Sequence, residues 1–438
     1  MEKLLSEIRK RNLKFDLYFS RSEANSVTFE QSELKDLTRK AIEGVGLRVI
    51  KDGKVGFSSS NDTNDIEMID MALNSAKYGK LAKFDFQKIE PYKCSFGSEE
   101  DRLDFEKLYP VSKEIVNYLQ NKYSAKVDID LTEIRTVINI TNSNSDVIAQ
   151  NLSASFSFST GIFSITPSGF VMSYMWDWKP TALTEEDLWN VVKKLEMTLI
   201  SYDKVASIKT GKYNVIFSPM TLLSTLGLSV NMGVNGYYLT RGISPLKDKL
   251  NEKILSEKIT IMDLPLDEFP GRREFDDEGV RTENREIISN GFLKNFLFDL
   301  DTAADMNKLT TGNGKRGSFS NMPSPAFHNF YVKEGDKPIE TIIKEQKQAI
   351  FFIFPIGGGQ SNLLMGDYSL NVGLGYLIEN GEIVGRIKDT MISGNIYEDF
   401  QRVLEISKES QYVPSFFGGS TFFKLPHILV ENVSVTTK

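Results

Sequence analysis

The residues best suited to chemistry in this 438-residue chain are three consecutive carboxylates, Asp276, Asp277 and Glu278. Zinc hydrolases use imidazole, thiolate and carboxylate ligands around an open water position, and two histidines and one cysteine leave few ways to build such a site. The triplet could by itself hold a hard cation weakly, but consecutive side chains of a strand point to alternate faces. This pattern favours a solvated turn or a loop-ordering contact over a cation site.

The other candidate nucleophiles and bases are isolated in the sequence. His328 and His427 lie far apart, and no residue is singled out as the catalytic partner of either, so each is interpreted as a hydrogen-bonded structural histidine. Cys94 stands alone, which excludes an intramolecular disulfide and a cysteine metal cluster. It is interpreted as a small packed side chain, and its isolation suits a reducing cytosol.

The glycine-rich segments do not match nucleotide-binding motifs. TTGNGKRGS at 310–318 lacks the glycine that a P-loop needs five residues before Gly314. Gly44 and Gly46 lead into a strand and not into a helix, so they do not form a dinucleotide fingerprint.

A third glycine-rich segment, GGGQ at 357–360, follows the apolar run AIFFIFPI. It indicates either a bulge or a position where the backbone of a ligand comes close. An exposed strand edge can accept an extended peptide as an added strand, so we predict a substrate surface that combines this edge with the acidic triplet. The predicted substrate-binding residues are Asp276, Asp277, Glu278, Gly357, Gly358, Gly359 and Gln360.

Composition limits the classes of function. With 40% hydrophobic and 25% charged residues, the chain is typical of a soluble globular protein with a large core. A net charge of -7 gives no electrostatic basis for gripping a phosphate backbone, so we expect no direct contact with nucleic acid. No signal peptide and no run of about 18 apolar residues is apparent, so we expect a cytoplasmic protein without a membrane span.

The first half of the sequence alternates helices with strands. Strands are predicted at 15–20 and 26–30, and Asp52-Gly53 predicts a type I′ hairpin turn within 47–57. Two antiparallel strands are predicted between 127 and 171. Four helices are predicted: one through Leu4, Leu5 and Ile8, one from an Asn61 or Asp62 cap through 66–76, one over 106–123, and one over 184–202 that begins with a capping pattern.

The second half is rich in strands and glycine. Asn290-Gly291 and Asn380-Gly381 predict hairpin turns, and helices are predicted near 220–232 and 396–407. The predicted fold class is α+β. We expect an N-terminal α/β domain over 1–206, with helices on a mostly antiparallel sheet, and a C-terminal β-rich domain with few helices over 207–438.

Five segments in order resemble the TldD/PmbA family, whose members carry the name "modulator of DNA gyrase". They are GVGLRVIKDGKVGFSSSND at 44–62, FDDEGVRTENREIISNGFLKNFLFD at 275–299, TTGNG at 310–314, GGGQSNLLMGDYS at 357–369 and GYLIENGEI at 375–383. The resemblance implies an N-terminal α/β domain joined to a C-terminal β-rich domain. It also implies a relation to zinc metalloproteases of the TldD branch, which act on unfolded or modified peptides in the cytosol.

The sequence departs from the TldD branch where the resemblance would place a metal. That branch carries an HExxxH segment on a helix and a cysteine near the C-terminus, and its glutamate activates water. Here Ser224 and Ser229 stand at the histidine positions, Thr225 at the glutamate position and Phe417 at the cysteine position. Hydroxyls and a phenyl ring cannot replace those ligands, so we expect no metal and no catalytic residue in this chain.

The leading hypothesis is therefore a PmbA/TldE-type subunit that pairs with a zinc-bearing TldD-type HExxxH subunit, with homodimerisation left open. One alternative is a peptidase with an unusual site of its own, built from carboxylates and His328. Another is a protein-binding modulator of a complex related to DNA gyrase.

Overall fold

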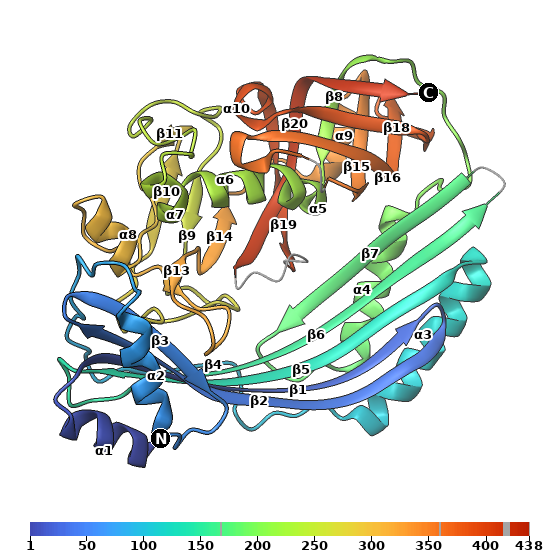
Figure 1. Cartoon of the computed structure of the whole chain (residues 1–438). Helices are drawn as coiled ribbons and strands as arrows, with labels where there is room; N and C mark the ends of the chain where they lie inside the picture. The colour runs from blue at the N-terminus through green and yellow to red at the C-terminus, as the bar shows by residue number, and fades with distance from the viewer. Residues whose placement is uncertain (167–168, 359–360, 415–420, 438) are drawn as a thin grey trace.

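The computed structural model describes residues 1–166, 169–358, 361–414 and 421–437. Two β-sheets, one from each half of the chain, form most of the molecule. In Figure 1 the first sheet is a long curved layer at the bottom, and the second half of the chain lies over its inner face. The fold is α+β with mostly antiparallel sheets, as the sequence predicts.

The first sheet has the strand order β3-β2-β1-β5-β6-β4, with β7 also paired to β6. Its strands are β1 (Lys14–Glu30), β2 (Glu33–Lys51), β3 (Lys54–Ser60), β4 (Lys93–Phe96), β5 (Lys126–Asn142), β6 (Ala149–Thr166) and β7 (Gly169–Lys179). Every pair is antiparallel except β4 with β6. The strand prediction at 15–20 and 26–30 is confirmed, but the division into two strands is wrong, because both segments belong to the single strand β1, which pairs with β2 and β5 along most of its length.

Local turn chemistry explains the β2–β3 hairpin. Asp52 and Gly53 have φ angles of 50° and 73°, the positive values that a type I′ turn requires at both central positions. This confirms the predicted hairpin.

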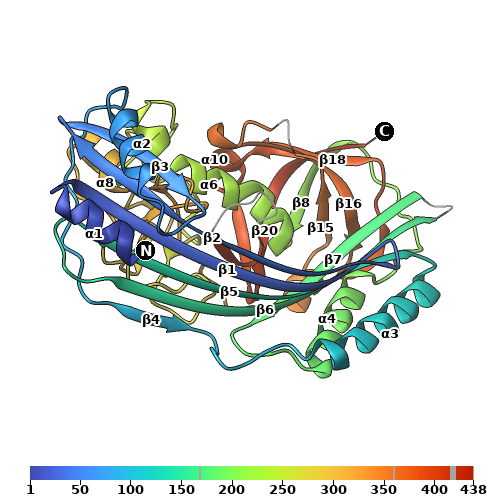
Figure 2. The ribbon, with the colours of Figure 1, turned by 60° about the horizontal axis from the view of Figure 1, so that its bottom comes forward.

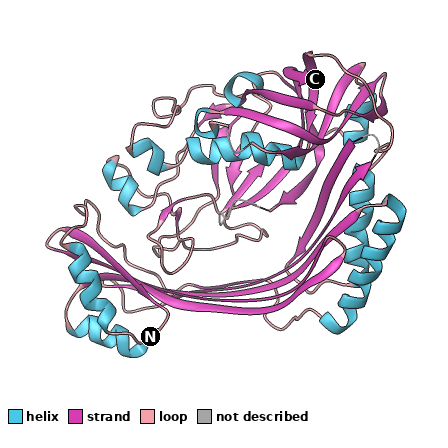
Figure 3. Ribbon diagram, turned by 45° about the vertical axis from the view of Figure 1, so that its right-hand side comes forward, coloured by secondary structure: helices cyan, strands magenta, loops and turns pink. Residues whose placement is uncertain are grey.

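Two pairs of helices cover the two ends of the outer face of this sheet (Figure 3). They are α1 (Glu2–Lys10) with α2 (Glu67–Ala76), and α3 (Phe105–Tyr123) with α4 (Glu185–Thr198). The predicted Asn61 or Asp62 cap of α2 is wrong, since the cap position is Ile66 and makes no side-chain cap bond. The capping pattern of α4 is confirmed: Thr184 and Asp187 form a reciprocal capping box.

The second sheet has eleven strands and closes on itself. Its main strands are β8 (Gly211–Phe217), β9 (Ile261–Asp263), β10 (Arg285–Ser289), β11 (Phe292–Leu293), β14 (Asn329–Val332), β15 (Gln348–Ile356), β16 (Asp367–Glu379), β17 (Glu382–Arg386), β18 (Thr390–Asn395), β19 (Val403–Val413) and β20 (Phe422–Thr437). The ring β20-β18-β16-β15-β8 returns to β20, which makes a barrel. The short strands β12 (Gly314–Lys315) and β13 (Ser324–Pro325) pair with each other.

The predicted Asn-Gly turns of this half are confirmed. Asn290 and Gly291 have φ angles of 46° and 80°, and Asn380 and Gly381 have φ angles of 50° and 81°. They join β10 to β11 and β16 to β17.

A helix packed on the barrel runs through α5 (Pro219–Leu222), a π-helical segment (Leu223–Gly227) and α6 (Leu228–Gly233). It contains the predicted helix at 220–232. Shorter helices are α7 (Gly236–Thr240), α8 (Leu300–Asp305), α9 (Ile339–Lys344), the 3₁₀ segment η2 (Leu363–Met365) and α10 (Ile396–Asp399).

The predicted helix at 396–407 is wrong beyond its first turn. The chain leaves α10 at Asp399 and enters β19 at Val403, where pairing with β20 overrides the local pattern. The predicted domain boundary near 206–212 falls between α4 and β8, and the division into 1–206 and 207–438 stays a prediction. None of the described helices is long and apolar enough to cross a membrane.

We predict that Thr184→Ala lowers the free energy of unfolding by about 1 kcal/mol, because the first turn of α4 loses the acceptor for the Asp187 N–H. Urea unfolding measures the change. The matched control is Thr181→Ala, at an exposed position just before the helix, which should leave the unfolding midpoint unchanged. Equal midpoints for the two variants would contradict the role of the cap.

Candidate functional site

The acidic triplet lies between the two halves of the molecule. Asp276, Asp277 and Glu278 are 0–1% exposed, so the alternative of a solvated turn is wrong. Asp276 accepts hydrogen bonds from the backbone N–H groups of Glu278, Val280 and Gly314 at 2.8–2.9 Å. The segment thus orders its own loop, as the other alternative predicts.

Two arginines connect this loop to the first sheet. Arg48 of β2 binds Glu278 Oε1 at 2.8 Å and Asp16 Oδ2 at 2.7 Å, and Arg316 binds the other oxygen of Asp16 at 2.8 Å. On the same loop, Arg273 lies 2.6 Å from Asp277. We call Asp16, Arg48, Glu278 and Arg316 the buried arginine–carboxyl cluster. It joins charges from both halves of the chain at a site closed to water.

Close packing surrounds this cluster. The Arg48 guanidinium lies 5.1 Å from the centroids of both the Phe84 and Phe86 rings. A Cβ atom on Gly314 would stand 2.5 Å from Glu278 Oε2, so the close approach of these two segments requires glycine there.

Burial dominates the acid–base behaviour of the carboxyl groups. It raises the pKa of Glu278 to about 8, against the lowering effect of Arg48, and the pKa of Asp276 to about 7. Nearby, burial raises the pKa of Asp263 to about 6 and lowers that of Lys315 to about 8.

His328 is buried, and its Nε2 lies 2.9 Å from the carbonyl oxygen of Gly312. Burial lowers the pKa of its imidazole well below the ordinary value, so the ring is neutral and Nε2–H donates to that carbonyl. His427 lies on β20, where burial lowers its pKa to about 4. Both fit the prediction of structural histidines, and the ring of His328 makes no hydrogen bond to a carboxylate among the described residues.

The predicted counterparts of the metal ligands lie on the helix at 219–233. Ser224 Oγ donates to the carbonyl of Met220 at 3.2 Å, and Thr225 Oγ1 to that of Thr221 at 2.8 Å. Ser229 is buried, and its Oγ has no partner among the described residues. Phe417 lies outside the described residues.

The π-helical segment gives these positions a common orientation. Residues five apart are separated by roughly 140° around an α-helix, but a π-turn, with its i to i+5 bonds, brings them close to one face. Ser224 and Ser229 are five apart, and the π-turn spans 223–227. The backbone therefore has the form that suits an HExxxH ligand pair, while the side chains are hydroxyls that do not fit zinc. Among the described residues, no group of three or more His, Cys, Asp or Glu side chains could hold a metal ion.

The glycine-rich segment begins where β15 ends. Gly357 and Gly358 have φ angles of 85° and 96°, a conformation that favours glycine. Gly359 and Gln360 lie outside the described residues, so binding of substrate at this edge stays a prediction. The acidic triplet is separated from solvent, and the structure gives no support to direct contact between its side chains and a substrate.

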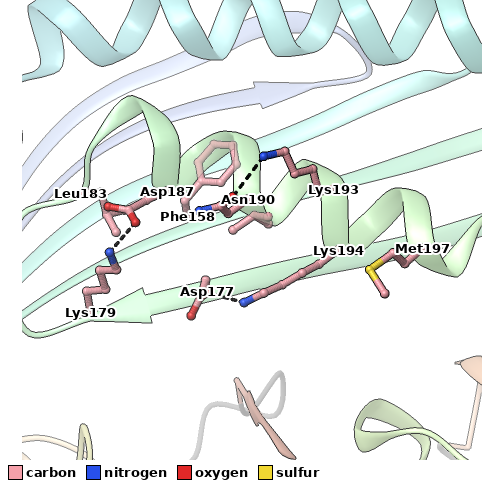
Figure 4. A pocket seen from close by; sticks show the side chains of 10 residues that line it. Phe158, Asp177, Lys179, Leu183, Asp187, Asn190, Lys193, Lys194 and Met197 are labelled. Atoms are coloured by element: carbon pink, nitrogen blue, oxygen red, sulfur yellow. Dashed lines mark hydrogen bonds and ion pairs between the residues drawn. The ribbon is translucent and has the colours of Figure 1, made fainter. Parts of the chain in front are cut away.

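A surface depression of about 390 Å³ lies between β7 and α4. Figure 4 shows two ion pairs in it, Lys179 with Asp187 and Lys194 with Asp177, and a hydrogen bond from Lys193 to Asn190. These pairs leave no convergent set of catalytic groups in the depression.

The prediction from sequence missed the partners of the triplet. Asp16 and Arg48 stand directly opposite each other in the register of β1 and β2. Each interrupts a run of apolar residues, FDLYF and LRVI, and that opposite pair of charges is the signal that could have located them. Arg273 and Arg316 carry no comparable signal.

Comparison with known protein families identifies the class to which this chain belongs. The model of the PmbA/TldA metallopeptidase C-terminal domain matches residues 210–437, and that of PmbA/TldA metallopeptidase domain 1 matches residues 15–77. The chain belongs to the PmbA/TldD metallopeptidase family.

Known proteins resemble the chain over nearly its whole length. The zinc metalloprotease TldD homologue of Saccharolobus solfataricus is 26% identical over 90% of this chain and 88% of its own. The crystal structure of TldE from Thermococcus kodakarensis has a TM-score of 0.82 at 24% identity, covering 99% of this chain and 100% of its own. A putative modulator of a DNA gyrase from Thermotoga maritima also has a TM-score of 0.82, at 22% identity and 99% coverage of both chains. These two structures show the same fold.

We predict that Arg48→Met lowers the free energy of unfolding by about 3–5 kcal/mol, because Glu278 loses its guanidinium partner inside the protein. Thermal and urea unfolding measure this loss. Arg21→Met removes a half-exposed arginine from the same sheet and should cost no more than about 1 kcal/mol. Similar losses of unfolding free energy for both variants would contradict a stabilising role of the buried arginine–carboxyl cluster.

We also predict that the carboxyl group of Glu278 makes the free energy of unfolding fall as the pH rises. Its carboxyl has an ordinary pKa of 4.5 and a folded value of about 8, so between these values the folded chain holds a proton that the unfolded chain has released. Its stabilising contribution is complete below about pH 4.5 and is lost as pH rises through about 8. Urea midpoints across this window should fall less steeply for Glu278→Gln than for the parent chain. Parallel slopes would contradict the assignment to Glu278.

Proposed function

We propose that this chain is the subunit without a metal site in a TldD/TldE-type metallopeptidase, which acts on unfolded or modified peptides. The observation that carries the proposal is the helix at 219–233. It has the π-turn that brings positions 224 and 229 to one face, but it presents two serines and a threonine there.

The chemistry of these side chains supports the assignment. Peptide hydrolysis by a metallopeptidase needs ligands that hold the ion and a base that activates the attacking water. Neutral hydroxyls are weak ligands for zinc, and Thr225 has no carboxylate to take a proton. Two of the three hydroxyls are already used by carbonyls of their own helix.

A TldD-type HExxxH subunit would then supply the zinc and the glutamate, and this chain would support that subunit and help to hold the peptide. We expect no cofactor in this chain, a cytoplasmic location and assembly with the partner, with homodimerisation left to measurement. The family and the Saccharolobus relative, both named for metalloprotease activity, support the reaction class.

The two alternatives have less support. A peptidase site built from carboxylates and His328 would need groups that reach a substrate, and these side chains are buried. A role in modulating a gyrase-related complex rests on the name given to the Thermotoga maritima protein, which is 22% identical and shows only that the fold is shared.

We predict that the purified chain retains no stoichiometric zinc, iron or other transition metal after dialysis, because its ligand positions are hydroxyls and Phe417. Elemental analysis measures the metal per chain. One tightly held metal that is lost in a His328→Ala variant would overturn the proposal in favour of an unusual site.

We predict that the chain alone leaves unstructured peptides intact and that mixing it with its HExxxH relative produces cleavage sensitive to chelators. Mutation of the relative's glutamate should abolish that cleavage, whereas Ser224→Ala and Thr225→Ala in this chain should change it little. Cleavage by this chain alone, at the same rate with and without the relative, would contradict the proposed division of roles.

A further inference from the structure

The inner face of the first sheet differs from its outer face in the middle of the long strands. On β1, Phe15 and Leu17 pack with α1 and α2, whereas Tyr18 packs with Phe275 and Phe319 from the second half of the chain. Successive side chains alternate between faces, so even-numbered residues of β1 point toward the second half. The same reasoning places even residues of β5 and odd residues of β6 on this inner face.

Hydroxyl side chains form two rows on the inner face. Ser22 of β1, Thr136 of β5 and Ser153 of β6 are directly opposite one another, and so are Ser26, Thr132 and Ser157. We call these six residues the hydroxyl floor. They are all half-buried, and Ile134, which lies between the rows, is 39% exposed, so solvent reaches this face.

Charge is separated between the two faces of the same strands. From Ser20 to Ser26, and on the paired residues of β5 and β6, the inner face carries no charged residue in these described strands. Two charged residues border this area on the same face: Lys40 of β2, opposite Ala24, and Asp130 of β5, which accepts a hydrogen bond from Thr132. The outer face over the same span carries Arg21, Glu23, Glu133 and Arg135. Figure 2 shows that the helices lie at the two ends and leave the middle of the strands uncovered. Exposure to solvent alone would not explain why one face is neutral and the other charged.

Two buried polar atoms without partners border the hydroxyl floor. Asn151 lies on β6 two residues before Ser153 of the first row, and its side chain is 3% exposed. Its Oδ1 has no hydrogen-bond partner among the described residues. Trp178 of β7 is opposite Ser157, at the end of the second row, and its Nε1–H is likewise without a partner. A buried polar atom without a partner costs about 1–3 kcal/mol, so one acceptor and one donor here indicate a ligand that supplies both N–H and C=O groups.

Half of the six floor hydroxyls have no side-chain hydrogen bond within the described part of the protein. Thr136 Oγ1 and Ser22 Oγ lie 3.4 Å apart, and Thr132 bonds Asp130, whereas Ser26, Ser153 and Ser157 have no side-chain hydrogen bond to protein in the described part of the chain. The two rows are four residues apart along the strands, a distance of roughly 13 Å. About four residues of an extended peptide would span this distance.

We propose that the hydroxyl floor binds an extended, uncharged segment of polypeptide through its main-chain and small polar groups. A peptide carries the N–H and C=O groups that Asn151 and Trp178 lack, and hydroxyls can both donate to and accept from a backbone. Between the two rows, the uncharged side chains of β1, β5 and β6 disfavour charged side chains of a ligand, which would lose hydration there without gaining a partner. This inference rests on the proposed function, since it places part of the peptide on this subunit, away from the zinc.

The test is peptide binding by the isolated full-length chain, without the HExxxH relative. The probe is a fluorescein-labelled peptide of about eight residues, long enough to span both rows, built from alanine, glutamine and threonine with the unlabelled end blocked. A second probe replaces two glutamines with lysine and a third replaces them with glutamate. We expect the neutral probe to bind about fivefold or more tightly than either charged one, the difference expected for burying an unpaired charge.

Matched variants locate the site. Ser22→Lys puts a long charged side chain in the first row and should weaken binding of the neutral probe about fivefold or more, while relieving the penalty on the glutamate probe. Asn25→Lys makes the same addition on the outer face of β1, at another half-buried position, and should leave binding unchanged. Trp178→Phe retains the ring that stacks on Phe96 but removes the donor, and should weaken binding about fivefold.

Absence of neutral-probe binding, or equal loss in Ser22→Lys and Asn25→Lys, would overturn this inference. If Ser22→Lys does not fold, as circular dichroism would reveal, Trp178→Phe decides. Measurements of peptide binding and of peptide cleavage test the two proposals separately. Floor-dependent binding without partner-dependent cleavage would refute the proposed function alone, whereas partner-dependent cleavage without floor-dependent binding would refute the hydroxyl floor alone.

Discussion

The arrangement of the two sheets depends on a cluster of charges that neither half could bury alone. Asp16 and Arg48 come from the first sheet, and Glu278 and Arg316 come from the second half of the chain. Burying a charge is costly unless a partner of opposite sign is fixed beside it. Each half therefore supplies groups that neutralise and hydrogen-bond the other's, and the cluster specifies one docking geometry. Gly314 and the phenyl rings over Arg48 close the site to water.

The long strands use their two faces for different purposes. At both ends, the outer face carries apolar side chains that pack under helix pairs, and the inner face carries residues that contact the second half. Between these ends, the outer faces of β1 and β5 are charged, whereas the inner faces of β1, β5 and β6 carry hydroxyls and no charge between Ser20 and Ser26, with Lys40 of β2 and Asp130 of β5 at the border. The period-two alternation of a strand makes this separation possible, because a one-residue step changes the face on which a side chain lies.

The helix at 219–233 has a backbone that would suit a pair of metal ligands, but its side chains are not metal ligands. Its π-turn gives positions 224 and 229 a common orientation, which would serve a pair of metal ligands in a relative that has histidines there. In this chain the same backbone is retained with side chains that bond to their own helix. A function in supporting or binding, with the hydrolytic step supplied elsewhere, is consistent with that combination.

The sequence by itself determined the features that depend on neighbouring residues. The three Asx-Gly turns, the capping box of α4 and the strand-rich second half follow from local backbone preferences, and five ordered segments identified the family. Contacts between distant residues decided the rest. The sequence left open whether the acidic triplet is a solvated turn or a loop-ordering contact, because Arg48, the partner of Glu278, lies 230 residues away. The strand that replaces the predicted helix after Asp399 depends on β20, near the end of the chain. Burial and sheet pairing are set by such contacts, and local periodicity does not encode them.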